Sequence, residues 1–363
     1  MKSKVLRKQA SGGRFEHFSG KLSKTLSLPS YGQAKNLIRL RPTLLRMTCR
    51  LVWLTAIWVA DGCHPAEAEF SGGKLLVVTT TGLIADAVRN VTGDAAEVHA
   101  LMGPGVDPHL YKATVRDIKL LTRADVVFYG GLHLEGKLED VLRKTGRIRA
   151  TVAVTDGIPK GRLLRAGKAS DSHDPHIWFD VGLWKDCVGQ ISRTLHRADS
   201  AHAALYQRNT ARYIAELDSL DAFVKMRLGQ IPKPQRVLVT AHDAFKYFGR
   251  AYDVEVRGLQ GISTLSEYGL RDVTDLVRFI TERRIRALFV ETSVSPRAIT
   301  AVVEGCRARG HSVRIGGDLY SDALGNARTN ADTYVKMVRH NVNTIAGALS
   351  PSAPEGRKKT EAF

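Results

Sequence analysis

Cysteine is scarce in this chain, with only four residues among 363, and no two of them form a C-x-x-C motif. Cys49 and Cys63 lie near the amino terminus, so the body of the protein keeps only Cys187 and Cys306. Two cysteines do not make the disulfide framework that stabilises small secreted domains. We therefore expect Cys187 and Cys306 to pack as small apolar side chains on their helices.

The sequence also lacks the local motifs of two large classes of hydrolase. It contains no H-E-x-x-H, in which two histidines of one helix bind zinc, and no G-x-S-x-G, in which a serine nucleophile lies on a sharp turn. The apolar run over residues 51–60 is too short for a membrane-spanning helix, which needs ~20 residues. A chain of this length can still bury a sizeable core, and its length favours two domains.

Positive charge is plentiful but unevenly distributed. The net charge is +18, yet residues 1–50 contain twelve Lys or Arg and a single acid, so they hold eleven of these charges. The remaining chain has no stripe of basic residues interleaved with aromatic ones, which is the pattern typical of nucleic-acid binding. We therefore predict no nucleic-acid partner.

The apolar run over residues 51–60 lies in the order typical of a secretory signal peptide. Arg46 and Arg50 precede it, and small residues follow it as far as Ala68. Residues 66–68, A-E-A, fit an A-x-A cleavage site. We predict a signal peptide over residues 47–68 and a periplasmic or otherwise extracytoplasmic protein, with an ordinary buried helix as the alternative.

Two features leave alternatives for where the protein starts and where its signal peptide ends. Residues 1–46 form a basic extension that is unusually long before a signal sequence, so Met47 is an alternative start of the protein. Cys63 follows a glycine and could be the lipidated residue of a lipoprotein, although the residues before the glycine are not the preferred ones. We favour cleavage near Ala68 over a lipid anchor at Cys63.

From residue 74 onward, short β-branched runs alternate with helical patterns in two successive passes. Continuous apolar strands separated by helical crossovers indicate parallel sheets covered on both faces. We predict an α/β fold of two lobes, over residues 74–198 and 235–349, each with a parallel sheet flanked by helices. The predicted strands are 74–82, 96–103, 124–131, 149–157, 236–243, 254–261, 286–293 and 312–321, and the predicted helices are 83–91, 114–122, 134–143, 181–196, 244–252, 270–284, 296–308 and 332–349.

A long helical pattern lies between the two lobes. Apolar residues such as Leu217 recur there at steps of three and four, and the pattern ends before Pro232. About thirty residues at 1.5 Å each correspond to ~45 Å of helix, which is longer than one lobe needs for a crossover. We predict a rigid linking helix over residues 199–231, with an ordinary crossover helix as the alternative, and a flexible tail over residues 350–363.

Four polar side chains follow predicted strands at their carboxyl ends, where open parallel sheets bind ligands. His109 and His176 each end a copy of the tripeptide Asp-Pro-His in the first lobe, His242 ends the first strand of the second lobe, and Asp322 follows its last strand. Three imidazoles and one carboxylate form a donor set that suits zinc and that manganese also accepts, while the absence of a thiolate disfavours cuprous ion. We therefore predict a divalent-metal site to which each lobe contributes two ligands.

Ligating imidazoles usually donate their second N–H to a carboxylate or a carbonyl group. We consider Asp117, Asp243 and Glu291 as such acceptors, with helix capping or surface solvation as their alternative roles. His133 lies on a glycine-rich turn after the third strand and is either a further contact of the site or a plain loop residue.

The stretches GPGVDPHLYKAT, DPHIWFDV, VTAHDAFKYFGRAY and LYSDALG occur in this order, with the long helix between the second and the third. Together they closely resemble the zinc- and manganese-binding extracytoplasmic solute-binding proteins of bacterial ABC importers, over roughly residues 74–349. The resemblance implies two α/β lobes bridged by one rigid helix, and metal ligation by His109, His176, His242 and Asp322. It also implies capture of a divalent metal outside the cytoplasmic membrane and its delivery to a permease and its ATPase.

Two departures from the family leave the preferred metal open. Zinc-dedicated members often carry a His- and acid-rich loop between the first two ligand motifs, whereas this interval is basic here and has no histidine cluster. Manganese-dedicated members often have Glu at the position of His242, so the histidine here favours zinc over manganese. Ferrous iron, which accepts His and carboxylate donors, is a third option.

Three functions are compatible with these residues. The leading one is the substrate-binding subunit of a metal importer, a monomer that binds its metal without catalysis. A secreted zinc hydrolase is disfavoured because catalytic zinc typically has three protein ligands and an open position for water, whereas four protein donors close the shell. A surface adhesin with a structural metal would share the fold.

Overall fold

The computed structural model describes residues 73–167 and 171–350. The predicted basic extension, the signal peptide and, apart from Ser350, the tail lie outside the described residues. No helix in the described part has both the length and the apolar composition that are needed to cross a membrane.

The first half of the described chain forms a four-stranded parallel sheet in the order β2-β1-β3-β4. Adjacent residues of a strand point to opposite faces, and Val77 and Val78 of β1 are both fully buried, in two different apolar clusters. The sheet is therefore covered on both faces, as its continuous apolar strands predict. Its strands are β1 (Leu75–Thr79), β2 (Ala96–Ala100), β3 (Val126–Tyr129) and β4 (Ala150–Ala153), and the helices are α2 (Gly82–Thr92), α3 (Val115–Arg123), α4 (Glu139–Thr145) and α5 (Val181–Ala198).

The second half contains two parallel strand pairs, β5-β6 and β7-β8, and β5 lies beside β7. Its apolar cluster includes Val239, Leu288 and Val302, which pack two strands against a helix. Cys306 in this cluster and Cys187 on α5 are buried and free, as predicted. The strands are β5 (Val237–His242), β6 (Glu255–Gln260), β7 (Ala287–Glu291) and β8 (Arg314–Leu319), and the helices are α7 (Lys246–Tyr252), α8 (Leu270–Glu282), α9 (Arg297–Ala308) and α10 (Tyr334–Leu349).

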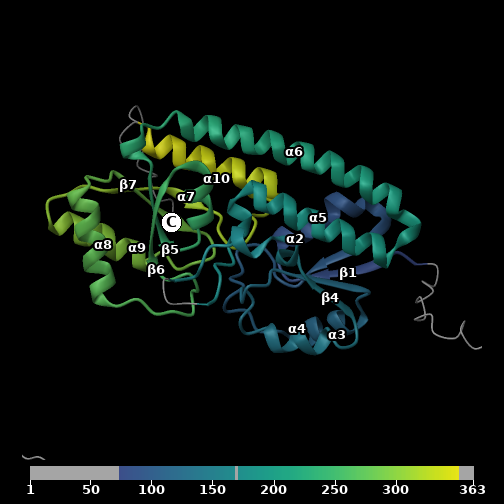
Figure 1. The fold of residues 1–363 in the computed structure, drawn as a ribbon. Coiled ribbons are helices and arrows are strands. Elements are labelled where there is room, and N and C mark those ends of the chain that lie inside the picture. Colours follow the sequence, from purple (N-terminus) through teal and green to yellow (C-terminus); the bar gives the residue numbers. More distant parts are fainter. Residues whose placement is uncertain (1–72, 168–170, 351–363) are drawn as a thin grey trace, which may run out of the picture. The chain divides into compact units, whose positions relative to one another are not determined.

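The two lobes are joined by α6 (Ala203–Gly229), a helix of 27 residues that lies along α5 and α10 (Figure 1). Its buried residues recur at steps of three, four or seven and face the same apolar cluster as residues of α2, α5 and α10. The linking helix is therefore packed against both lobes along its length. Two α/β lobes with parallel sheets and one long joining helix confirm the predicted fold class. The buried side chains of α6 are Tyr206, Tyr213, Leu217, Leu220, Val224 and Leu228.

A buried carboxylate connects the first helix of the fold with the last. Asp86 on α2 accepts a hydrogen bond from the backbone N–H of Tyr334, the first residue of α10 (3.0 Å). The hydroxyl of Tyr334 donates to the carbonyl of Trp178 (2.7 Å), so the start of α10 has two polar anchors in the first lobe. Burial raises the pKa of Asp86 to about 6.

Several predicted boundaries in the first lobe differ from the structure, since β1 and β2 end at Thr79 and Ala100, before the predicted residues 82 and 103. The helix predicted over residues 134–143 begins only at Glu139, and the residues before it form a turn in which Glu135 accepts a hydrogen bond from the N–H of Gly130 (2.6 Å). The fourth predicted strand is shorter than expected and continues as the 3-10 turn Val154–Gly157. Both segments lie where the chain leaves the carboxyl end of a strand.

Replacing Leu217 on α6 tests the packing of the linking helix. Leu217 is fully buried, so we expect Leu217→Ala to lower the free energy of unfolding by about 2–5 kcal/mol through lost contacts and a residual cavity. Gln207→Ala, at an exposed position of the same helix, should change it by less than about 0.5 kcal/mol. Urea unfolding followed by circular dichroism measures both, and equal losses would contradict this packing.

Candidate metal centre

The structure brings the four predicted side chains together at the carboxyl ends of strands from both lobes. His109 lies in the loop after β2, His176 precedes the 3-10 turn Ile177–Phe179, His242 is the last residue of β5, and Asp322 follows β8. One ligand atom of each residue lies within 4.8 Å of those of the others. Each of the four residues is 0–1% exposed, so the group is sealed from solvent.

The Nε2 atoms of the three histidines converge on the Asp322 carboxylate. Nε2 of His242 is 3.3 Å from one carboxylate oxygen, and Nε2 of His176 is 3.4 Å from the other. Nε2 of His109 is 3.3 Å from Nε2 of His176 and 4.0 Å from Asp322. Four donor atoms from two lobes are thus directed at one small volume.

Carboxylates lie on the far side of two rings, hydrogen-bonded to His176 and in ion-pair contact with His242. Nδ1 of His176 is 2.8 Å from Asp174, and Nδ1 of His242 is 2.6 Å from Glu291. Glu291 also accepts a hydrogen bond from the backbone N–H of His242 (2.9 Å). Such a contact sets which ring nitrogen is free to bind a metal, and here it leaves Nε2 facing inward.

Of the three predicted acceptors, only Glu291 contacts the imidazole of a predicted ligand. Asp117 belongs to the capping box at the start of α3, and Asp243 pairs with Lys246 (2.6 Å), so both have the alternative roles of capping and surface pairing. Asp174 is the acceptor that the sequence analysis missed. Its signal is its position two residues before His176, within Asp-Pro-His.

The repeated Asp-Pro-His holds two of the predicted ligand histidines through the backbone. Asp107 accepts a hydrogen bond from the N–H of His109 (2.8 Å), and Asp174 accepts one from the N–H of His176 (3.0 Å). A short Asp side chain that bonds the backbone two residues on is the geometry of an Asx turn. Each tripeptide therefore closes a stiff turn that presents its histidine to the site.

The charges of these side chains depend on one another. Burial opposes ionisation of Asp322, but the imidazoles of His242 and His176 outweigh it and hold the pKa of Asp322 well below its usual range. Burial lowers the pKa of His176, yet the carboxylates of Asp174 and Asp322 outweigh it and raise this pKa to about 9. Burial also lowers the pKa of His242, but the carboxylates of Glu291 and Asp322 on either side of the ring outweigh it and raise this pKa. For His109 burial dominates and lowers the pKa to about 4, so this ring is neutral at pH 7.

Several polar atoms of the site have no hydrogen-bond partner within the described residues, among them both carboxylate oxygens of Asp322 and Nε2 of His242. A buried polar atom without a hydrogen bond costs free energy, and a divalent cation held by the four donors would remove that cost. Zinc and manganese both suit this set of nitrogen and oxygen donors. Four protein donors can fill the coordination shell of the ion, as in sites that bind a metal without keeping a coordination position open for water.

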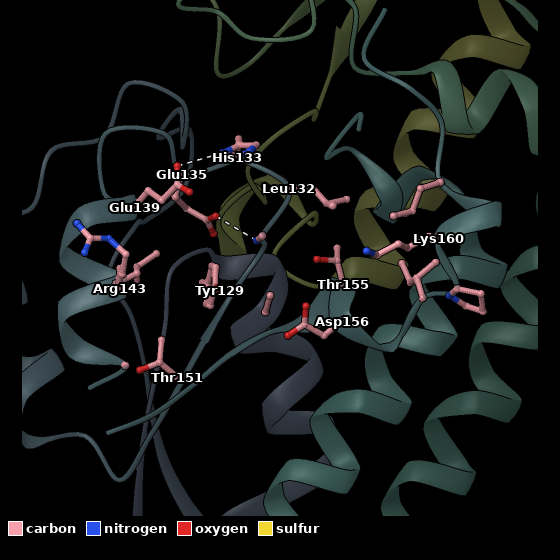
Figure 2. Close-up of a pocket in the computed structure, with 17 residues that line it drawn as sticks. Tyr129, Leu132, His133, Glu135, Glu139, Arg143, Thr151, Thr155, Asp156 and Lys160 are labelled. Atoms are coloured by element: carbon pink, nitrogen blue, oxygen red, sulfur yellow. Dashed lines mark hydrogen bonds and ion pairs between the residues drawn. The ribbon is translucent and has the colours of Figure 1, made fainter. Parts of the chain in front are cut away.

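His133 is not a member of this group and lines a separate cavity of about 670 Å³ at the carboxyl ends of β3 and β4 (Figure 2). Its Nδ1 is 3.0 Å from Glu139, and its φ of 65° lies in the left-handed region. Buried Glu135 stabilises this turn, since it accepts hydrogen bonds from the N–H of Gly130 (2.6 Å) and the hydroxyl of Thr80 (2.7 Å). His133 is therefore a loop residue, the alternative role.

The similarity of this chain to known proteins covers both lobes and the linking helix. Residues 77–348 match the family model described as zinc-uptake complex component A, periplasmic. The chain belongs to this family. One relative of this chain, the manganese-binding lipoprotein MntA of Bacillus subtilis (strain 168), is 50% identical over 297 residues, which cover 82% of this chain and 97% of MntA. The zinc-binding protein TroA of Treponema pallidum (strain Nichols) is 44% identical over 311 residues, which cover 86% of this chain and 99% of TroA.

A solved structure shows the same relationship in three dimensions. The periplasmic zinc-binding protein TroA from Treponema pallidum superposes with a TM-score of 0.75 at 46% sequence identity, covering 77% of this chain and all of that structure. The resemblance inferred from the four sequence motifs is thus confirmed for the zinc-uptake component A family.

Proton release tests the charges assigned to the site. His176, with its pKa raised to about 9, carries a proton at pH 7 and must lose it to bind a metal. Lower pH strengthens this competition, so zinc affinity should fall as the pH drops from about 9 to 6, by about tenfold per pH unit for each proton released. Calorimetric titration in buffers of different ionisation enthalpy counts the protons, and an affinity independent of pH over this range would contradict the assignment.

Glu291→Gln tests whether the outer carboxylate supports the imidazole of His242. The substitution keeps the size of the side chain but removes its charge, so we expect metal affinity to fall by about 10- to 100-fold. Asp243→Asn is the matched control, because Asp243 is adjacent to His242 in the chain but pairs with Lys246. Competition with a chromogenic chelator measures both affinities, and equal effects of the two substitutions would count against this role.

Proposed function

We propose that this chain is the substrate-binding subunit of an ABC importer that captures a divalent transition metal and delivers it to a membrane permease with its ATPase. His109, His176, His242 and Asp322 are the proposed ligands. The observation that carries the proposal is the buried convergence of these four donors, two from each lobe, in a chain of the zinc-uptake component A family.

The donor set and the relatives limit the proposed metal to zinc or manganese, with ferrous iron as a further candidate. Three imidazoles and one carboxylate suit zinc best, whereas a carboxylate that binds through both oxygens also accommodates manganese. The relatives are divided in the same way, since MntA is named for manganese and TroA for zinc. Competition among the three ions on protein purified without chelator decides between them.

The proposed output of this chain is binding, because four protein donors leave a metal no open position of the kind that a catalytic zinc offers to water. We propose that it acts as a monomer outside the cytoplasmic membrane, with lobes over residues 74–198 and 235–349 joined by the helical segment 199–231. For export we propose the signal peptide over residues 47–68. MntA is named a lipoprotein, which keeps Cys63 as the alternative anchor to cleavage near Ala68.

Replacing His176 or Asp322 with Ala tests the site and the function together. Each substitution removes a donor, so we expect bound zinc, measured by elemental analysis, to fall from about one ion per chain to a small fraction, while the circular dichroism spectrum is retained. The same variants should fail to support growth of an importer-deficient strain in zinc- and manganese-depleted medium.

His133→Ala is the control for these substitutions, because His133 lies at the separate cavity. It should keep the metal content and the growth of the wild-type protein. Wild-type metal content in both His176→Ala and Asp322→Ala would overturn the ligand assignment.

A further inference from the structure

A metal ion held by four buried side chains can exchange only when the segments that cover them move apart. The rate of that movement depends on contacts between the lobes that lie outside the ligand set. One such contact joins Asp107 of the first lobe to Thr264 of the second, which are 157 positions apart in the chain.

This contact belongs to a continuous series that connects a ligand of one lobe with a ligand of the other. Gln260, the last residue of β6, is paired with His242 across the β5-β6 ladder. Its side-chain amide donates to the carbonyl of Thr264 (2.8 Å), and the hydroxyl of Thr264 donates to Asp107 (2.6 Å). The other oxygen of Asp107 accepts from the backbone N–H of His109 (2.8 Å). The series thus begins at His242, ends at His109 and passes around the site.

The two copies of Asp-Pro-His differ in how they use the aspartate. Asp174 directs the same oxygen to the N–H and to the ring of His176, entirely within the first lobe. Asp107 directs one oxygen to the N–H of its own histidine and the other to the second lobe. The side chain of Asp107 thus ties the turn of His109 to the second lobe. The turn of His176 meets the second lobe through its backbone instead, where the hydroxyl of Tyr247 donates to the carbonyl of Asp174 (3.0 Å).

An apolar contact accompanies the hydrogen bond. Leu265, the neighbour of Thr264, lies against the first lobe, where its Cδ1 is 3.8 Å from the position that a Cβ at Gly136 would occupy. Leu265 remains 47% exposed, so this contact contributes less than a buried one. The hydroxyl of Thr264 is thus the more specific part of the bridge, because it needs one geometry of the two loops.

We propose that Thr264 is a positioning residue for the metal site, which holds the turn of His109 from the opposite lobe through Asp107 and thereby slows metal release. This role rests on the proposed function. The bond can form only while the two loops are together, so it favours the closed arrangement over any arrangement that exposes the ligands. A hydrogen bond to a charged group is among the stronger ones in proteins, so its loss has a measurable effect on a dissociation rate.

Thr264→Val and Thr264→Ser separate the hydroxyl from the rest of the side chain. Valine keeps the shape and removes the donor, so zinc should leave Thr264→Val about tenfold faster than the wild-type protein, the factor that corresponds to 1.4 kcal/mol. Serine keeps the donor, so Thr264→Ser should release zinc within about twofold of the wild-type rate. Stopped-flow transfer of zinc from the full-length loaded protein to an excess of chelator measures all rates.

Thr274→Val is the matched control, because Thr274 is exposed on α8 and its hydroxyl donates to a carbonyl of its own helix. It should release zinc at the wild-type rate. Release from Thr264→Val at the wild-type rate, or equally fast release from Thr264→Val and Thr264→Ser, overturns the role of the hydroxyl. A wild-type protein that retains none of zinc, manganese and ferrous iron would instead refute the proposed function, so the two failures are distinguishable.

Discussion

Asp322 places a carboxylate in the interior of the protein, and the rest of the site is arranged around its charge. Two imidazoles keep it ionised, and each of them meets a further carboxylate on its other side, Asp174 or Glu291. A single buried charge would be costly, whereas an alternating series of anions and protonated rings gives every ion neighbours of opposite sign. A divalent cation that enters this series replaces protons, so metal and protons compete for the same buried positions.

Parallel sheets explain how residues far apart in the chain reach this charge. Loops that follow the carboxyl ends of parallel strands emerge on one edge of each sheet, and the two edges face the same interior space. Neither lobe supplies more than two donors, so the complete set exists only where the lobes meet. Direct contacts fix this meeting, among them the hydrogen bond from the indole of Trp178 to the carbonyl of Ser321 (2.9 Å).

Local spacing and strand ends were sufficient to predict the eight strands, the long joining helix and the four residues that converge. The role of Glu291 as an acceptor could also be predicted, because a charged residue at the end of a buried strand is unusual. Asp174 could not be predicted as an acceptor. The sequence Asp-Pro-His is the same whether its aspartate bonds the backbone alone or the imidazole ring as well, and only packing decides between the two. The link from Thr264 to Asp107 depends on how two distant loops meet, which no local pattern encodes. The late start of α4 was also not predicted, although the contact seen there is local, between the carboxylate of Glu135 and the N–H of Gly130.

The apolar cluster that contains Leu217 also contains residues of α2, α5 and α10, such as Val88, Trp184 and Tyr334. This cluster is continuous across the two lobes, although the sheets are separate and each lobe also has a smaller apolar cluster of its own. The two lobes therefore share a large part of their core. Severing the chain at the lobe boundary would leave apolar surface uncovered on both products.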